Sequence, residues 1–144
     1  INALALLNQQ DVTYQIEKNK NESGFSNYIE LSLSNDKDTI KIGGTVLSGF
    51  GPRIVRINNF SLDFKPNQYQ IVTCHNDQPG IVGKTGNLLG DNGINIGSMT
   101  LGRTIEGGQA LMILSIDQPA SQTLVTELNN AIPFNKIIST KLTL

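Results

Sequence analysis

The chain has 144 residues, and its 11 lysines and arginines against 12 aspartates and glutamates leave a net charge of −1 at pH 7. This near-neutral charge supplies no basic surface field for nucleic acid or for an anionic membrane, so we expect neither as a partner. One cysteine and one histidine are too few for a disulfide framework or a Cys/His metal site, so no bound metal is expected.

The first residues are not typical of a signal peptide, because they lack a basic stretch and a continuous apolar stretch. Apolar residues at positions 1, 4, 5 and 7 have helical spacing and predict the end of a helix. Elsewhere the apolar runs reach only five or six residues, as at 110–114, whereas a membrane-spanning helix needs roughly 20. We therefore expect a cytoplasmic chain that is a piece of a longer protein.

Residues 12–64 contain short runs in which apolar and polar residues alternate, separated by polar, turn-forming stretches. This pattern predicts β-strands, which we expect at 12–16, 28–33, 39–42 and 54–57. Pro66 and Asn67 would break a strand that continued past residue 64. Residues 1–67 are therefore predicted to form a β-rich domain.

Residues 68–144 alternate between strand and helix patterns and are predicted to form a second domain. A helix is expected to follow Pro79-Gly80, and another to follow Ser121, a favoured capping residue. Strands are expected at 69–74, 94–103, 109–117 and 137–144. The order βαββαβ is the split βαβ pattern of ferredoxin-like folds, so the chain is predicted to be α+β.

Two glycine-containing stretches invite a nucleotide-binding interpretation that their spacing excludes. Gly83-Lys84-Thr85 looks like the end of a phosphate-binding loop, but the glycine required five residues earlier is Gln78. The glycines at 80, 83 and 86 do not match a dinucleotide-binding fingerprint. No nucleophile, base and orienting carboxylate fall in a catalytic pattern either. We expect neither a nucleotide site nor catalytic residues in this chain.

His75 and Asp77 fall at a strand end, just before the helix expected after Pro79. The free N–H groups of a helix's first turn attract a carboxylate, and a histidine can donate to the same group. An aspartate can accept from an ammonium. These complementary groups suit a free amino acid as the ligand. The alternative is that Asp77 only caps the turn and that His75 is an exposed strand end.

Three motifs stand out in the second half: H-x-D-x-P-G at 75–80, G-I-N-I at 93–96 and G-G-Q-A-L-M at 107–112. Together they resemble an ACT domain, and more narrowly that of the long-form D-3-phosphoglycerate dehydrogenases. Residues 43–64 resemble the intervening domain of the same enzymes. Ile1-Asn2-Ala3 is similar to their V-N-A-P segment, with Leu4 replacing the proline. The likeness covers essentially the whole chain.

The resemblance implies the regulatory region of an enzyme that oxidises 3-phosphoglycerate with NAD, the first step of L-serine biosynthesis. NAD would bind in a catalytic portion outside this chain. L-serine would bind between two ACT domains as a feedback inhibitor, which implies a homo-oligomer formed through these domains. The strand expected at 94–103 would be an edge strand able to pair between subunits.

By motif position, the resemblance assigns L-serine contacts to His75, Asp77 and Asn95, and to the first-turn amides near Ile81 and Val82. His75 and the helix amides would take the serine carboxylate. Asp77 and the amide oxygen of Asn95 would take its ammonium. For Asn95 the alternative is an ordinary turn residue.

The first half contains candidate anion-binding residues. Arg53 and Lys65 fall where some members of the family bind phosphate or a substrate carboxylate, and Arg56 lies nearby. Arginine suits an anion because its guanidinium donates in a fork. The alternative is a solvated basic edge strand. A third basic residue of those relatives corresponds to Ser115 here, which departs from their pattern.

Two other functions are compatible with the same domain order. The regulatory part of an iron–sulfur L-serine dehydratase has the same two domains, although residues 103–112 and the I-N-A opening favour the dehydrogenase. Alternatively, the ACT domain is an assembly module without a ligand. That function would place apolar side chains in the space between His75, Asp77 and Asn95.

Overall fold

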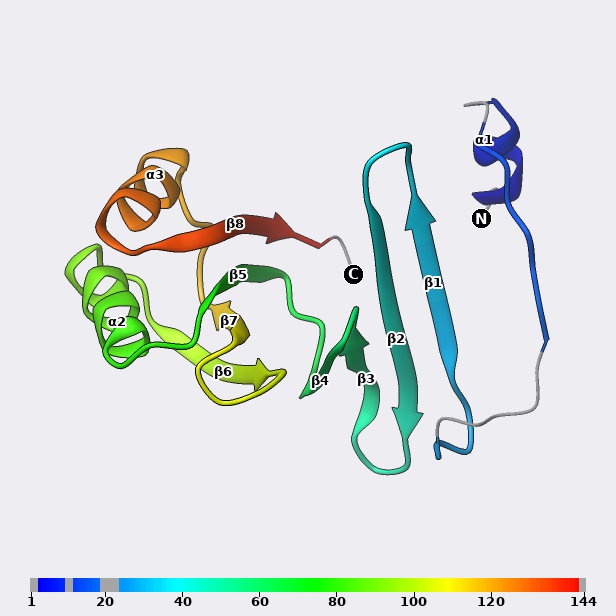
Figure 1. Cartoon of the computed structure of the whole chain (residues 1–144), viewed down its shortest axis with the longest axis horizontal. Helices are drawn as coiled ribbons and strands as arrows, with labels where there is room; N and C mark the ends of the chain where they lie inside the picture. The colour runs from blue at the N-terminus through cyan, green and yellow to red at the C-terminus, as the bar shows by residue number, and fades with distance from the viewer. Residues whose placement is uncertain (1–2, 10–11, 19–23, 143–144) are drawn as a thin grey trace.

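The computed structural model of the chain describes residues 3–9, 12–18 and 24–142, which form two antiparallel four-stranded sheets and three helices (Figure 1). The first sheet has the order β1-β2-β3-β4, with β1 (Ile29–Ser34), β2 (Thr39–Leu47), β3 (Gly51–Ile57) and β4 (Phe60–Phe64). The second sheet has the order β6-β7-β5-β8, with β5 (Tyr69–Asn76), β6 (Ile96–Arg103), β7 (Gln109–Ile116) and β8 (Phe134–Lys141). The helices are α1 (Ala3–Gln9), α2 (Ile81–Asp91) and α3 (Gln122–Ala131), none of them long and apolar enough to cross a membrane.

The second half has the predicted order βαββαβ, which confirms the α+β fold with a ferredoxin-like unit. Ser121 caps α3 as predicted, because its hydroxyl oxygen accepts from the Leu124 N–H at 3.1 Å. Helix α2 begins immediately after Gly80, whose φ of +89° lies in the left-handed region that favours glycine. Strand β8 begins at Phe134, earlier than predicted, and residues 143–144 lie outside the described residues.

The first half departs from the predictions at two places. The strand predicted at 12–16 is wrong, because residues 12–18 have no regular secondary structure. The prediction also omits β4, which follows β3 through a two-residue turn at Asn58-Asn59. Asn58 adopts a φ of +48°, and its N–H donates to the Lys41 carbonyl oxygen at 2.8 Å. The helix predicted near the start of the chain is α1, while residues 1–2 of the I-N-A motif lie outside the described residues.

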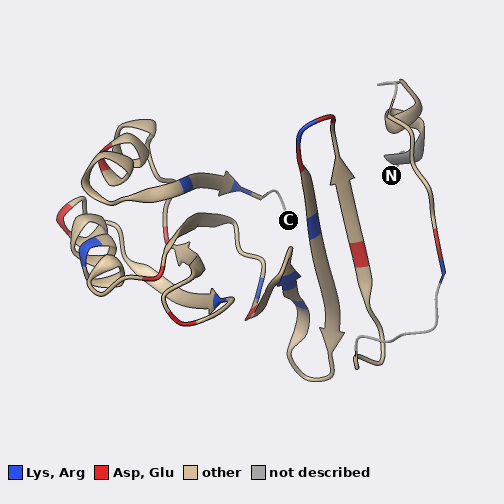
Figure 2. Cartoon of the chain, viewed as in Figure 1, with Lys and Arg blue, Asp and Glu red and all other residues tan. Residues whose placement is uncertain are grey.

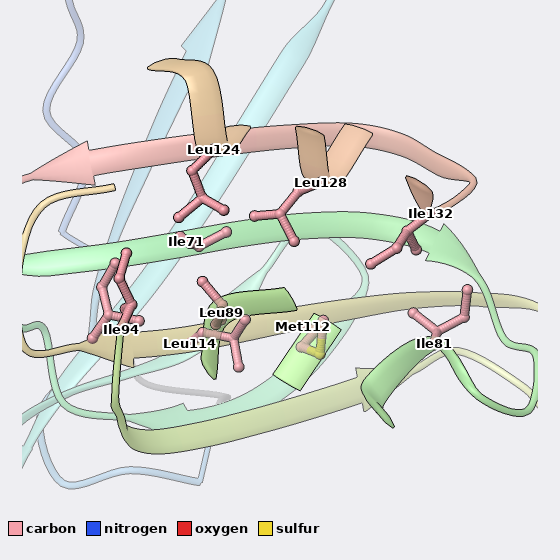
Figure 3. Packing of buried hydrophobic residues seen from close by; sticks show 10 residues of the cluster. Ile71, Ile81, Leu89, Ile94, Met112, Leu114, Leu124, Leu128 and Ile132 are labelled. Carbon is pink, nitrogen blue, oxygen red and sulfur yellow. The ribbon is translucent and has the colours of Figure 1, made fainter. Parts of the chain in front are cut away.

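The main hydrophobic core lies between helices α2 and α3 and one face of the second sheet (Figure 3). Ile81, Thr85 and Leu89 are buried on one face of α2, at the spacing of an amphipathic helix. The buried cluster also draws residues from β5, β7 and α3, among them Ile71, Met112, Leu114, Leu124 and Leu128. This packing holds the start of α2 next to the end of β5.

Part of the opposite face of the second sheet is covered by β4 of the first sheet. Phe60, Leu62 and Phe64 alternate along β4 and are buried against Leu111 and Ile113 of β7. In Figure 1, β4 lies towards the second sheet, whose far side carries α2 and α3. The predicted division into domains 1–67 and 68–144 falls in the connection between β4 and β5, and it stays a prediction because the two sheets share this cluster.

Candidate functional site

Asp77 lies in the loop between β5 and α2 and is held by the turn between β6 and β7. Its backbone N–H donates to the Gly108 carbonyl oxygen at 2.7 Å. Its side-chain Oδ2 accepts from Arg103 Nη1 at 3.0 Å and from the Gly107 N–H at 3.3 Å. Three hydrogen bonds therefore position the aspartate, although Arg103 lies 26 residues further along the chain.

The carboxylate of Asp77 is ionised and accessible. The hydrogen bond from Arg103, and then that from the Gly107 N–H, lowers the pKa of Asp77 below its ordinary value. Both bonds use Oδ2, and none of the described residues donates to Oδ1. With 21% of its side chain exposed, Asp77 keeps one carboxylate oxygen that can accept from a cationic group.

The first turn of α2 follows Asp77 closely and has backbone N–H groups without a partner inside the helix. The first helical bond runs from the Lys84 N–H to the Gly80 carbonyl oxygen at 2.9 Å, so the N–H groups of Ile81 and Val82 precede it. No side chain of the described residues caps this helix. The interpretation that Asp77 caps the turn before α2 is therefore wrong, because its carboxylate accepts from the β6–β7 turn instead.

His75 lies in β5, two residues before Asp77, and is only 2% exposed. Its ring meets the Phe134 ring edge-on, with centroids 5.9 Å apart, and its Nδ1 lies 3.5 Å from Thr73 Oγ1. Burial lowers the pKa of His75, and the Asp77 carboxylate opposes this shift. The interpretation of His75 as an exposed strand end is therefore wrong. At neutral pH it is a buried, neutral imidazole with one N–H donor.

Asn95 lies just before β6, at the opposite end of that strand from Arg103 and Asp77. Its Nδ2 donates to Asp117 Oδ2 at 3.0 Å, and the Asp117 N–H donates to the Asn95 carbonyl oxygen at 3.3 Å. A strand of eight residues is roughly 25 Å long. One chain therefore brings His75, Asp77 and the start of α2 together but keeps Asn95 away from them.

Arg103 and Gly107 belong to the site, although the sequence reasoning omitted them. The sheet register places Arg103 opposite Ala110, and Ala110 opposite His75, so the three residues form one row across β6, β7 and β5. The signal that could have found Arg103 is the predicted pairing of 94–103 with 109–117, because a hairpin between them places Arg103 next to the strand that ends at His75.

Arg53 and Arg56 lie on the same face of the first sheet because β3 is irregular between them. The register pairs Arg53 with Thr45 and Arg56 with Gly43, two residues apart on β2. Arg53 Nε donates to Asp63 Oδ1 at 2.6 Å, so this cation is already paired. Figure 2 shows basic and acidic positions close together around β3 and β4.

Lys65 lies in the connection between β4 and β5. Its carbonyl oxygen accepts from Gln70 Nε2 at 3.4 Å, and the same nitrogen donates to the buried Ser115 Oγ at 3.3 Å. Ser115 therefore contributes an uncharged hydrogen bond between β5 and β7. Neither Arg56 nor Lys65 forms an ion pair with a described residue.

The part of the chain that the structure describes contains no group of three or more His, Cys, Asp or Glu side chains placed to hold a metal ion. It also contains no glycine-rich loop that leads from a strand into a helix. Gly80 precedes α2, and Gly83 and Gly86 lie inside it. These residues do not fit a dinucleotide cofactor.

Comparison with known proteins shows what this chain is similar to. The family model described as ACT domain matches residues 69–133. The chain is 37% identical over 142 residues to the D-3-phosphoglycerate dehydrogenase of Bacillus subtilis (strain 168), which is 99% of this chain and 26% of that protein. It is 31% identical to the enzyme of the same name from Synechocystis sp. (strain ATCC 27184 / PCC 6803 / Kazusa), with the same coverage of both chains. It is 34% identical over 94 residues to D-3-phosphoglycerate dehydrogenase 3, chloroplastic, of Arabidopsis thaliana, which is 65% of this chain and 16% of that protein.

The chain thus spans 26% of the length of its Bacillus and Synechocystis relatives. The matched family model covers the βαββαβ unit, and the matches to these two relatives also include the first sheet. These findings confirm the resemblance expected from the sequence motifs. Residues 69–133 match the ACT domain model, and the chain is similar over nearly its whole length to one part of two proteins named D-3-phosphoglycerate dehydrogenase.

Proposed function

We propose that this chain regulates a D-3-phosphoglycerate dehydrogenase by binding L-serine beside Asp77. The observation that carries the proposal is an ionised, partly exposed carboxylate that keeps one oxygen without a donor among the described residues, close to a helix start that no described side chain caps. An amino acid carries an ammonium and a carboxylate on one carbon. Its two charged groups match a carboxylate acceptor and helix amide donors that lie close together.

In this proposal the serine ammonium donates to Asp77 Oδ1. The serine carboxylate accepts from the first-turn N–H groups of Ile81 and Val82, where the positive end of the helix dipole favours an anion. The neutral imidazole of His75 supplies one further N–H donor to the carboxylate. The His75 ring is only 2% exposed, so the ligand carboxylate must reach into the site to accept from it.

The position of Asn95 supports a site shared between two copies of the chain. Strand β6 is an edge strand, and Met99 and Leu101 on it are exposed. Met99 lies midway between Asn95 and Arg103. Two β6 strands paired antiparallel about Met99 would therefore set Asn95 of one copy beside Arg103 and Asp77 of the other. The amide oxygen of Asn95 would then accept from the serine ammonium and complete the site.

This arrangement makes L-serine a regulator of assembly as well as a ligand. A ligand shifts an equilibrium only towards the state that it binds more tightly. Serine held by residues of two copies stabilises the paired arrangement. The parent enzyme would oxidise 3-phosphoglycerate with NAD bound outside these residues, and L-serine would act as its feedback inhibitor.

The test is isothermal titration calorimetry of the chain with L-serine, using D-serine and glycine as competing ligands. We expect stereospecific binding of L-serine that weakens at least about tenfold in Asp77→Asn, because the variant loses the charged acceptor but keeps its shape. Asp91→Asn, at the other end of α2, changes the charge equally and should bind like the parent chain.

Absence of heat with millimolar L-serine in the parent chain would reject the sensor function and favour the assembly module. Equal weakening in Asp77→Asn and Asp91→Asn would show that general charge, not the proposed contact, matters. The names of the relatives favour the dehydrogenase over an iron–sulfur L-serine dehydratase.

We also propose a weaker anion site for phosphate or a substrate carboxylate on the first sheet. The supporting observation is that the irregular register of β3 brings Arg53 and Arg56 to one face, while Arg56 and Lys65 lack ion pairs with described residues. We expect inorganic phosphate to shift the NMR signals of Arg56 and Lys65, and Arg56→Gln to reduce the shift at Lys65. Unchanged spectra at millimolar phosphate would reject the anion site and favour the alternative, a basic strand exposed to solvent.

A further inference from the structure

Arg103 places a positive charge at the proposed amino-acid site. It is the last residue of β6, with 56% of its side chain exposed. One guanidinium nitrogen, Nη1, donates to Asp77 Oδ2 at 3.0 Å, and its other N–H groups donate to none of the described residues. Asp77 Oδ1 can therefore accept a hydrogen bond from a ligand, and the remaining N–H groups of Arg103 beside it can donate to the same ligand.

Stability does not account for this ion pair. Exposed ion pairs contribute little to folding, and two backbone bonds already tie Asp77 to the β6–β7 turn, one from the Asp77 N–H and one from the Gly107 N–H. The main consequence of Arg103 is therefore the net charge that a ligand meets.

The charges around Asp77 can be counted from each packed element. Arg103 from β6 and His75 from β5 are the charged and titratable groups that act on the Asp77 carboxylate. His75 is buried and neutral at pH 7, Asp77 carries one negative charge, and Arg103 carries one positive charge. The site is therefore neutral overall. Without Arg103 it would carry a negative charge and attract any amine.

Building on the proposed function, we infer that Arg103 is a specificity-determining residue that makes this site select a zwitterionic amino acid over a simple amine. Its guanidinium holds Oδ2 of Asp77 and leaves Oδ1 for the ligand ammonium. Its positive charge favours the ligand carboxylate and opposes a cation that has none. Arg103 thus adds to the helix amides a requirement for the carboxylate of the ligand.

L-serine and ethanolamine test this role directly, because ethanolamine is serine without its carboxylate. The measured quantity is the ratio of the two dissociation constants, from calorimetry on the 144-residue chain. We expect the parent chain to prefer L-serine. In Arg103→Gln the ratio of the two dissociation constants should fall roughly tenfold, because one unit charge several ångströms from a ligand near the surface has an effect of this size. Arg103→Lys keeps the charge and should keep most of the preference.

Lys141→Gln is the matched control, since it removes one positive charge at the far end of β8 and should leave the ratio unchanged. Partial unfolding of a variant does not alter the ratio, because both ligands are measured on the same preparation. If the parent chain binds L-serine but Arg103→Gln keeps the parent ratio, the role of Arg103 is rejected and the sensor function stands. If the parent chain binds neither ligand, the sensor function itself is rejected, together with the role of Arg103.

Discussion

The two sheets have the same number of strands and the same antiparallel pairing, but their burial differs. In β7, inside the second sheet, seven of the eight residues are buried, whereas all six residues of β1 are exposed. Strand β7 has helices α2 and α3 on one face and β4 on the other. Strand β1 lies at the edge of the first sheet, away from the second sheet and from helices α2 and α3 (Figure 1).

The difference shows that alternation predicts a strand without predicting how deeply it is buried. Leu31 and Leu33 alternate along β1 as regularly as Leu62 and Phe64 do along β4. Of these four residues, those of β4 meet a second layer, because β4 faces Leu111 and Ile113 of the second sheet. We conclude that the tightly packed core belongs to the ACT domain and extends into the first half mainly through β4.

The largest expected effect is on the free energy of unfolding, and it is tested with one buried and one exposed leucine. Leu128 is fully buried at 0% exposure, while Leu31 is 66% exposed. We expect Leu128→Ala to lower the free energy of unfolding by about 3 kcal/mol, since it leaves a cavity. Leu31→Ala should change it by no more than about 0.5 kcal/mol. Urea denaturation measures both, and comparable losses would contradict the contrast between the two sheets.

A smaller effect is expected where the two sheets meet. A β-carbon added to Gly102 of β6 would lie 2.6 Å from Leu62 Cδ2 and 3.0 Å from the Ser61 carbonyl oxygen. We expect Gly102→Ala to cost about 1–2 kcal/mol, because β4 must move away from β6. Hydrogen exchange should rise in β4 before it rises in α2 and α3.

Gly97→Ala is the control on the same strand, since its β-carbon would meet nothing closer than 3.5 Å. If both alanines have the same effect on unfolding, the close approach of β4 to β6 does not stabilise the pair of sheets.

The third effect is a dependence of stability on pH. Burial lowers the pKa of His75 in the folded chain, so the unfolded chain binds more protons as pH falls through about 6.5. The stability that His75 contributes is therefore present above this pH and is lost progressively below it. His75→Phe keeps a ring against Phe134 and should flatten this slope. Thermal melts between pH 5 and 8 measure it, and an unchanged slope would assign the dependence to other groups.

Sequence reasoning located most of the second half and part of the first. It anticipated the βαββαβ order, the Ser121 cap and the start of α2, because these depend on residues close together in the chain. It omitted β4, because the sequence prediction did not identify Asn58-Asn59 as a turn between two strands. It also predicted a strand at 12–16, where the chain has the alternation of a strand but no regular structure.

The sequence by itself determined the resemblance to the D-3-phosphoglycerate dehydrogenases, the order of the elements in the second half and the residue types around Asp77. Only the tertiary structure decided that Arg103 meets Asp77, that His75 is buried and neutral, and that Asn95 lies at the other end of β6. The physical reason is that these features depend on sheet register and layer packing. Both bring together residues that are far apart in the chain, and local patterns carry no information about which distant strand becomes a neighbour.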